Sequence, residues 1–275
     1  MQTHEWNFQS FDGLDMYARE WTPDGGMKAA LILVHGLGEH CGRYAHVGAM
    51  LAKNGYGLFG FDLRGHGKSG GPRGHTPSFE AFMKDIDTMI GKVVERFPDV
   101  PRFIYGHSLG GILVLNYVLR RKPELKGAVV TSPGLRTALE EQKAKVVMAK
   151  LLGALAPAGS LPSGLNADVL SHDLENIHAY KTDPLVHDKV SFGMGKNLLA
   201  AIQWAFDHAS EFSVPLLLMH GAEDQIAYPR GSQEFAALVK GDCTLKLWEG
   251  MYHEIHNEPE KEKVFAHLLE WLAKH

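Results

Sequence analysis

A serine between two glycines, in Gly106-His107-Ser108-Leu109-Gly110, has the spacing that nucleophilic catalysis requires. In the G-x-S-x-G arrangement the serine lies on a sharp turn between a strand and a helix, so its hydroxyl is exposed. The glycines make room for this turn because they carry no Cβ atom. The sequence therefore predicts a nucleophile at Ser108, and the alternative is a glycine-rich turn whose serine only caps the helix.

A serine hydroxyl is a weak nucleophile at neutral pH, and it needs an imidazole to accept its proton and a carboxylate to orient that imidazole. Asp224 and His253 each follow an apolar, strand-like run later in the chain. The chain order Ser, Asp, His is the one associated with this type of turn. We therefore predict that Ser108, Asp224 and His253 form a catalytic triad.

Three neighbours compete for these roles. Glu223 adjoins Asp224, but two adjacent side chains cannot both point at one imidazole. His220 lies at the end of its strand with no loop behind it, and His256 is three residues closer to the last helix than His253. These considerations favour Asp224 as the acid and His253 as the base.

Backbone N–H groups are expected to stabilise the oxyanion that develops during acyl transfer. The residue after the nucleophile, Leu109, offers one such group in the first helical turn, where N–H groups are unpaired. A second group is expected in the glycine-containing loop His35-Gly36-Leu37-Gly38, which follows an earlier strand. We predict an oxyanion hole formed by the N–H groups of Leu37 and Leu109.

The elements that must position these residues alternate along the chain. Apolar runs predict strands at Trp6–Phe8, Leu14–Trp21, Ala29–Val34, Gly57–Phe61, Arg102–Tyr105, Gly127–Thr131, Val214–Met219 and Thr244–Trp248. Helical spacing predicts helices at Tyr44–Asn54, Phe79–Phe97, Leu109–Arg121, Ser232–Val239 and about Pro259–Ala273. Buried strands that alternate with helices are typical of an α/β fold with a mostly parallel sheet covered on both faces.

This alternation stops between residues 135 and 207, where no buried strand is visible. A structureless loop of this length is improbable in a compact domain, so we expect a helical cap inserted over the carboxyl edge of the sheet. Apolar residues at helical spacing in it are candidates for substrate binding, namely Val147, Met148, Leu151 and Leu152. The alternative is that these stripes belong to ordinary core helices.

Size and charge limit the remaining possibilities. The 275 residues can form one domain, 1–275, and a net charge of −4 without a long basic run argues against a nucleic-acid partner. The N-terminus has no signal-peptide pattern and no run is long enough to span a membrane, so we expect a cytoplasmic protein. The sixteen histidines suggest a metal, but their spacing matches no known metal site and we expect none. No feature specifies an oligomeric state.

Five segments together resemble the α/β-hydrolase family, and within it the branch of monoacylglycerol lipases, lysophospholipases and serine aminopeptidase-like enzymes. The segments are His35-Gly36-Leu37-Gly38-Glu39-His40 with Gly42-Arg43-Tyr44, Asp62 with Arg64-Gly65-His66-Gly67-Lys68-Ser69, Gly106–Gly111, His220-Gly221 with Asp224, and Tyr252-His253 with His256. The resemblance implies an α/β-hydrolase fold with an eight-stranded sheet. It also implies a serine hydrolase without a cofactor, and a polar group of Glu39, Arg43 and His256 near the end that binds the substrate head.

The leading hypothesis is hydrolysis of small-molecule lipid esters with one acyl chain, monoacylglycerols first, through an acyl-enzyme. The alternatives are a lysophospholipase or general carboxylesterase, a proline-type aminopeptidase with the same triad, and a non-catalytic binding protein on this scaffold. The apolar stripe from Val147 to Leu155 could in addition make transient contact with a membrane surface.

Overall fold

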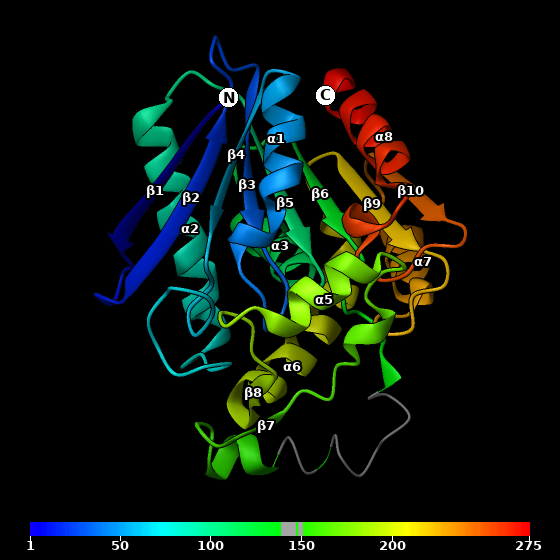
Figure 1. Ribbon diagram of the computed structural model, residues 1–275. Coiled ribbons are helices and arrows are strands. Elements are labelled where there is room, and N and C mark those ends of the chain that lie inside the picture. Colours follow the sequence, from blue (N-terminus) through cyan, green and yellow to red (C-terminus); the bar gives the residue numbers. More distant parts are fainter. Residues whose placement is uncertain (139–146, 148–150) are drawn as a thin grey trace.

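A computed structural model of the protein describes residues 1–138, 147 and 151–275. Its centre is one eight-stranded sheet in the order β1-β2-β4-β3-β5-β6-β9-β10 (Figure 1). The strands are β1 (Gln2–Gln9), β2 (Asp15–Thr22), β3 (Ala29–Val34), β4 (Tyr56–Phe61), β5 (Arg102–His107), β6 (Gly127–Thr131), β9 (Leu216–Gly221) and β10 (Cys243–Trp248). All eight predicted strands are present, and the predicted α/β class is confirmed.

The sheet is parallel except at β2, which pairs antiparallel with both of its neighbours, β1 and β4. The β1–β2 hairpin turns at Asp12-Gly13, where Gly13 adopts a φ of 79°. The inner strands consist of continuous apolar runs because both of their faces are covered. Every residue of β3, β4 and β9 is accordingly buried.

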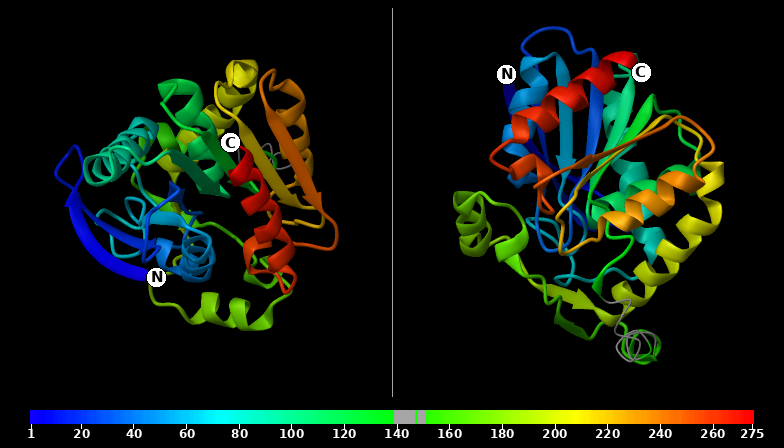
Figure 2. Two further views of the ribbon diagram at one scale, coloured as in Figure 1. Left: turned by 90° about the horizontal axis from the view of Figure 1, so that it is seen from above. Right: turned by 90° about the vertical axis from the view of Figure 1, so that its right-hand side faces the viewer.

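Helices cover the two faces of the sheet in two groups (Figure 2). They are α1 (Ala45–Lys53), α2 (Phe79–Arg96), α3 (Leu109–Arg121), α7 (Pro229–Leu238) and α8 (Lys261–Lys274). Successive residues of a strand point to opposite faces. Ile32 of β3 packs in the core that contains α2, α3 and α7, whereas the preceding Leu31 packs in the core that contains α1 and α8.

A long insertion connects β6 to β9. Its described elements are β7 (Ser160–Pro162), η3 (Ala167–Val169), α5 (Leu174–Thr182), β8 (Lys189–Ser191), α6 (Phe192–His208) and η4 (Ala209–Glu211). Figure 1 shows α5, β7, β8 and α6 beyond the end of the sheet to which the parallel strands point. Helix α6 also packs on the domain, since Nδ2 of Asn116 in α3 donates to the carbonyl of Ala201 at 3.2 Å and the Arg120 guanidinium lies 3.7 Å from the Trp204 ring. Part of the insertion therefore belongs to the hydrophobic core that contains α2 and α3.

Several element boundaries differ from those predicted. β5 continues through Gly106 to His107, because these residues still pair with β6. β9 begins at Leu216 and continues to Gly221 alongside β10, so His220 lies inside a strand. Helix α7 begins at Pro229, a residue whose fixed φ favours the first helical position.

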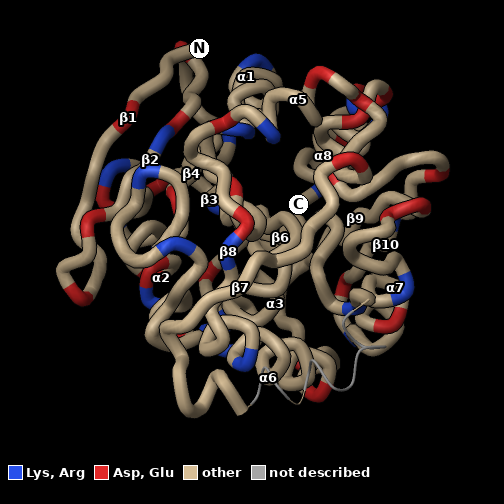
Figure 3. Tube along the Cα trace, turned by 60° about the horizontal axis from the view of Figure 1, so that its bottom comes forward, with Lys and Arg blue, Asp and Glu red and all other residues tan. Residues whose placement is uncertain are grey.

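The surface carries charges of both signs. In Figure 3, lysines and arginines are interspersed with aspartates and glutamates over the helices and loops. Within the described ranges, no helix combines the length and apolar character needed to cross a lipid bilayer.

Candidate active site

Ser108 occupies the turn between β5 and α3 with φ 54° and ψ −113°, a left-handed conformation that is rare for a residue with a side chain. Glycine is required on both sides. A Cβ atom on Gly106 would lie 2.4 Å from the Gly110 carbonyl oxygen, and one on Gly110 would lie 1.9 Å from the Val34 carbonyl oxygen. The strain is thus imposed by surrounding backbone, and it leaves Ser108 partly exposed between buried neighbours.

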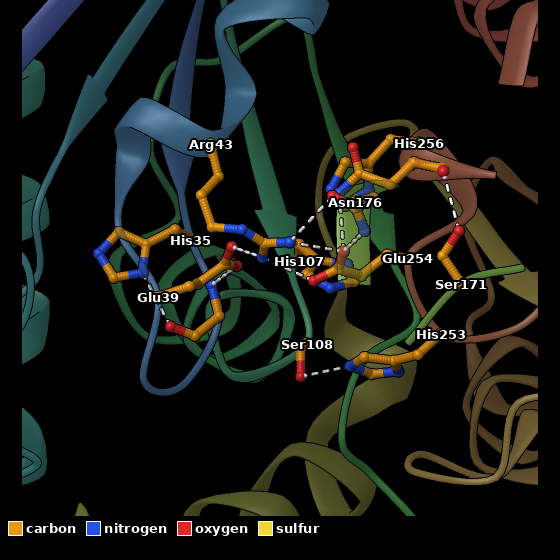
Figure 4. A network of polar contacts seen from close by, with 12 residues as sticks. His35, Glu39, Arg43, His107, Ser108, Ser171, Asn176, His253, Glu254 and His256 are labelled. Carbon is orange, nitrogen blue, oxygen red and sulfur yellow. Dashed lines mark hydrogen bonds and ion pairs between the residues drawn. The ribbon is translucent and has the colours of Figure 1, made fainter. Parts of the chain in front are cut away.

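The structure brings the three residues of the predicted triad together although Ser108 and His253 are 145 positions apart. Nε2 of His253 lies 2.9 Å from Oγ of Ser108, and Nδ1 of the same ring lies 2.7 Å from Oδ2 of Asp224 (Figure 4 shows the Ser108–His253 contact). Asp224 follows β9 and His253 follows β10. With Nδ1–H donated to the carboxylate, Nε2 is free to accept the serine proton.

Burial and charge act in opposite directions on this pair. Burial alone would lower the pKa of His253, but the Asp224 carboxylate outweighs it and raises the pKa above the ordinary value. Burial would raise the pKa of Asp224, yet the two imidazoles of His253 and His220 hold that pKa far below its usual range. Asp224 therefore stays ionised at any pH at which His253 changes charge.

The loop after β3 lies against Ser108, since a Cβ atom on Gly36 would be 3.3 Å from that of Ser108. Two side chains shape it. Oε1 of Glu39 accepts the N–H of Gly36 at 2.6 Å, and the neutral His35 ring bonds the Gly36 carbonyl at 2.8 Å and the Leu63 N–H at 2.9 Å. Burial lowers the pKa of His35 to about 3, which keeps Nε2 an acceptor. The Leu37 N–H belongs to this loop, and the Leu109 N–H lies in the first turn of α3.

The chain matches a family model described as serine aminopeptidase S33 over residues 25–260. The chain belongs to this hydrolase family. A monoacylglycerol lipase of Mycolicibacterium smegmatis is 35% identical over 98% of this chain and 97% of its own length. The crystal structure of a monoacylglycerol lipase of Paleococcus ferrophilus superposes with a TM-score of 0.85 at 36% identity and covers both chains fully. An uncharacterized abhydrolase domain-containing protein of Dictyostelium discoideum is 43% identical over 98% of this chain, which spans 29% of that protein.

These similarities confirm the predicted α/β-hydrolase family and its monoacylglycerol lipase branch, and they place the protein among the carboxylic ester hydrolases. The eight-stranded sheet is the one that the resemblance to this family implied.

The three alternative candidates for the catalytic acid and base, Glu223, His220 and His256, lie in environments that differ from those of Asp224 and His253. Glu223 is exposed, whereas Asp224 is buried beside the imidazole. The His220 ring contacts Asp224 and not Ser108, with Nε2 3.0 Å from Oδ2 of Asp224. His256 is buried, stacked on Tyr44 with ring centroids 4.8 Å apart, and neither of its ring nitrogens has a hydrogen-bond partner among the described residues.

Glu39 and Arg43, which the resemblance implied at the head-binding end, form a buried ion pair of 2.7 Å (Figure 4). The Arg43 guanidinium also binds both carboxylate oxygens of Glu254, at 2.6 and 2.8 Å. Glu254 in turn accepts the side-chain amides of Asn176 at 2.9 Å and Asn257 at 2.7 Å. Arg43 thereby connects the loop beside Ser108 to the residue after His253.

The insertion contacts the same loop through residues that sequence reasoning missed. The backbone N–H of His187 donates to the Gly38 carbonyl at 2.9 Å, and Nε2 of His40 lies 2.8 Å from Oδ2 of Asp183. The Tyr180 ring lies 4.7 Å from the Arg43 guanidinium. Adjacency to His253 is the one sequence signal that could have drawn attention to Glu254, and α5 carries no comparable signal for Asn176.

The apolar stripe of the insertion is largely exposed. Val147 and Leu151 expose 57% and 60% of their surface, Leu155 exposes 82%, and Leu152 is half-buried. Met148 lies outside the described residues. Substrate binding by this stripe stays a prediction.

The sixteen histidines do not converge on a metal site in the described parts of the chain, where no three His, Cys, Asp or Glu side chains form a metal-binding group. Instead, several of their rings pack on one another. His107 lies next to both His253 and His256, with centroid separations of 4.9 and 4.8 Å.

Proposed function

We propose that this carboxylic ester hydrolase cleaves monoacylglycerols through an acyl-enzyme intermediate on Ser108. The observation that supports it most directly is the continuous contact from Ser108 Oγ through the His253 ring to Asp224, at 2.9 and 2.7 Å. The substrate class rests on the monoacylglycerol lipase from Mycolicibacterium smegmatis, which is similar along nearly its whole length. Lysophospholipids and simple carboxylic esters are the alternatives with the same chemistry.

In the proposed reaction, Oγ of Ser108 attacks the ester carbonyl carbon while Nε2 of His253 takes its proton. The N–H groups of Leu37 and Leu109 receive the oxyanion, and the helical position of Leu109 favours negative charge there. When the carbon–oxygen bond breaks, His253 returns the proton to the departing alcohol. Water then attacks the acyl-enzyme by the same route and releases the fatty acid.

We further propose that residues 135–207 act as a cap over this site, within a single domain of residues 1–275. The exposed side chains of Val147, Leu151 and Leu155 support an acyl-binding or membrane-contacting role for this stripe, in a cytoplasmic enzyme that contacts membranes transiently. Glu39, Arg43 and His256 would border the alcohol end of the substrate. Both ring nitrogens of His256 are buried and lack a hydrogen-bond partner in the described part of the chain, so a substrate hydroxyl that reached them could bond to either.

Amide cleavage by an aminopeptidase is a second candidate because the family model carries that description. Such an enzyme needs a carboxylate for the free amine, but two of the carboxylates in the described part of the insertion already have other partners. Asp173 caps α5, and Asp168 pairs with Lys181 at 2.5 Å. Turnover of a proline arylamide well above that of 1-monooleoylglycerol would favour the aminopeptidase.

The test is hydrolysis of 1-monooleoylglycerol by the wild type, by Ser108→Ala and by a matched surface variant, Ser210→Ala. We expect Ser108→Ala to lose at least about 10³-fold in kcat with an unchanged thermal midpoint, and to lose labelling by a fluorophosphonate probe. Ser210 is exposed in η4, so its variant should match the wild type. Hydrolysis by Ser108→Ala at the wild-type rate would overturn the proposal.

A further inference from the structure

His220 is a fully buried imidazole four positions before Asp224, and the triad as usually drawn gives it no role. Its Nε2 lies 3.0 Å from Oδ2 of Asp224 and 2.8 Å from the carbonyl oxygen of Ala227. Neither oxygen carries a hydrogen, so Nε2 must supply it. On the other side of the ring, Nδ1 lies 2.7 Å from the hydroxyl of Ser232, which is itself fully buried in α7.

The carboxylate of Asp224 accepts hydrogen bonds at four positions. Oδ1 accepts the backbone N–H groups of Ile226 at 2.8 Å and Ala227 at 3.0 Å. Oδ2 accepts Nδ1–H of His253 at 2.7 Å and Nε2–H of His220 at 3.0 Å, a hydrogen that His220 shares with the Ala227 carbonyl at 2.8 Å. A carboxylate offers about four lone-pair sites, so the group is saturated. His220 occupies the site on Oδ2 that His253 leaves open.

We propose that His220 is a positioning residue, which holds Oδ2 of Asp224 so that the carboxylate meets His253 in one orientation. This proposal rests on the function proposed above, in which His253 accepts the serine proton. The backbone donors fix Oδ1 only. Without His220, Oδ2 would retain a single donor, and rotation of the carboxylate about its Cβ–Cγ bond would move it relative to the His253 ring.

The placement of His220 makes it rigid enough for this task. It lies in β9, whose six residues are all buried and pair with β10. Ser232 in α7 contacts the opposite ring nitrogen, and the contacts of Nε2 with Asp224 and Ala227 hold the ring independently of Ser232. Partners of this kind orient the group that touches the substrate, although they do not touch the substrate themselves.

A merely structural role, in which His220 only joins β9 to α7, predicts different results from the same variants. Two amide side chains of different length, Gln and Asn, distinguish the positioning role of His220 from the structural one. In His220→Gln the side-chain amide can donate from the position of Nε2, whereas in His220→Asn the shorter amide stays on the Nδ1 side, near Ser232. Ser232→Ala removes the contact with α7 and leaves the bond to Asp224 in place.

We expect His220→Asn to lower kcat about 10- to 100-fold on 1-monooleoylglycerol with KM within about twofold of the wild type. His220→Gln and Ser232→Ala should stay within about fivefold of the wild-type kcat. Proton NMR gives a second readout, because the low-field resonance of the hydrogen between His253 and Asp224 should shift or broaden in His220→Asn alone. Thermal unfolding of each variant shows whether it is folded at the assay temperature.

The proposal is overturned if folded His220→Asn retains the wild-type kcat and low-field resonance. It is overturned equally if the Asn, Gln and Ala variants lose kcat in proportion to their loss of stability. If the Asn variant does not fold, the Gln variant decides, and a kcat more than about tenfold below wild type in folded protein counts against the proposal. Unchanged hydrolysis by Ser108→Ala would instead refute the proposed function, whatever the His220 variants do.

Discussion

Replacement of Arg43 by methionine tests whether the polar cluster beside the triad stabilises the fold. Methionine has a similar length but no charge, so Arg43→Met removes the cation that lies between Glu39 and Glu254. The side chains of Arg43, Glu39 and Glu254 are 8%, 3% and 2% exposed, so solvent screens this interaction little. The variant would leave two carboxylates buried without their counter-charge.

Removal of one partner from a buried ion pair costs about 3–5 kcal/mol of unfolding free energy. For a chain of this size each kcal/mol lowers the thermal midpoint by about 2 °C, so the expected decrease is roughly 6–10 °C. The upper half of this range applies if both carboxylates remain ionised. The lower half applies if one of them binds a proton instead.

The sign of the pH dependence follows from the two carboxylates. In the wild type, burial raises the pKa of Glu39 despite Arg43, whereas for Glu254 the guanidinium outweighs burial and lowers the pKa. Without Arg43, both folded-state pKa values lie above the unfolded value of about 4.3. The folded variant then holds protons that the unfolded chain has lost, so its stability falls as pH rises through this window. The deficit relative to wild type should be smallest near pH 5 and largest near pH 8.

The assay is urea unfolding of wild type and variant at three pH values, about 5, 6.5 and 8. Lys92→Met is the control, since Lys92 pairs with Glu95 in an exposed i,i+3 contact and its loss should cost less than about 0.5 kcal/mol. A deficit for Arg43→Met below about 1 kcal/mol, or one equal at pH 5 and pH 8, would refute the reasoning.

Three further outcomes are expected. Gly110→Ala should lower the unfolding free energy measured in urea by at least about 2 kcal/mol, because its Cβ would lie 1.9 Å from the Val34 carbonyl oxygen. The control Gly91→Ala, whose Cβ would have no atom within 4 Å, should be neutral or slightly stabilising. Equal stabilities of the two variants would contradict this expectation. Only neutral His253 can accept a proton, and Asp224 raises the pKa of His253. The value of kcat/KM should therefore fall as the pH drops through a midpoint above about 6.5, and a midpoint below this pH would contradict the expectation. Dialysis against EDTA should leave ester hydrolysis unchanged, whereas a loss that zinc restores would show a metal requirement.

The sheet and the serine turn could be predicted because their physical causes are local. β3 is a continuous apolar run since both of its faces are buried, and such runs are visible in a sequence. Gly106 and Gly110 are required by backbone atoms that a Cβ would contact, so their spacing marks the turn. The convergence of Ser108, Asp224 and His253 could be predicted because each residue follows a strand, and the carboxyl ends of parallel strands meet at one edge of the sheet.

The contacts that surround the triad could not be predicted because they join residues far apart without periodicity. Arg43 and Glu254 are separated by 211 positions, and nothing near either residue specifies the other. The strands β7 and β8 have three residues each, which is too short for an alternating pattern to be recognised. The bond between His220 and Asp224 depended on β9 continuing past Met219, a boundary that the apolar run alone did not define.

The pairing of Arg43 with Glu254 also bears on how the protein is made. Residue 254 leaves the ribosome directly behind His253 and after every strand of the eight-stranded sheet. A nascent chain that ends before residue 253 lacks the proposed general base and leaves Arg43 with Glu39 as its remaining carboxylate partner, while Ser108 has already been synthesised. By the proposed mechanism, a polypeptide released early would be unable to hydrolyse esters, and because it would also be poorly stabilised, it would be exposed to proteases.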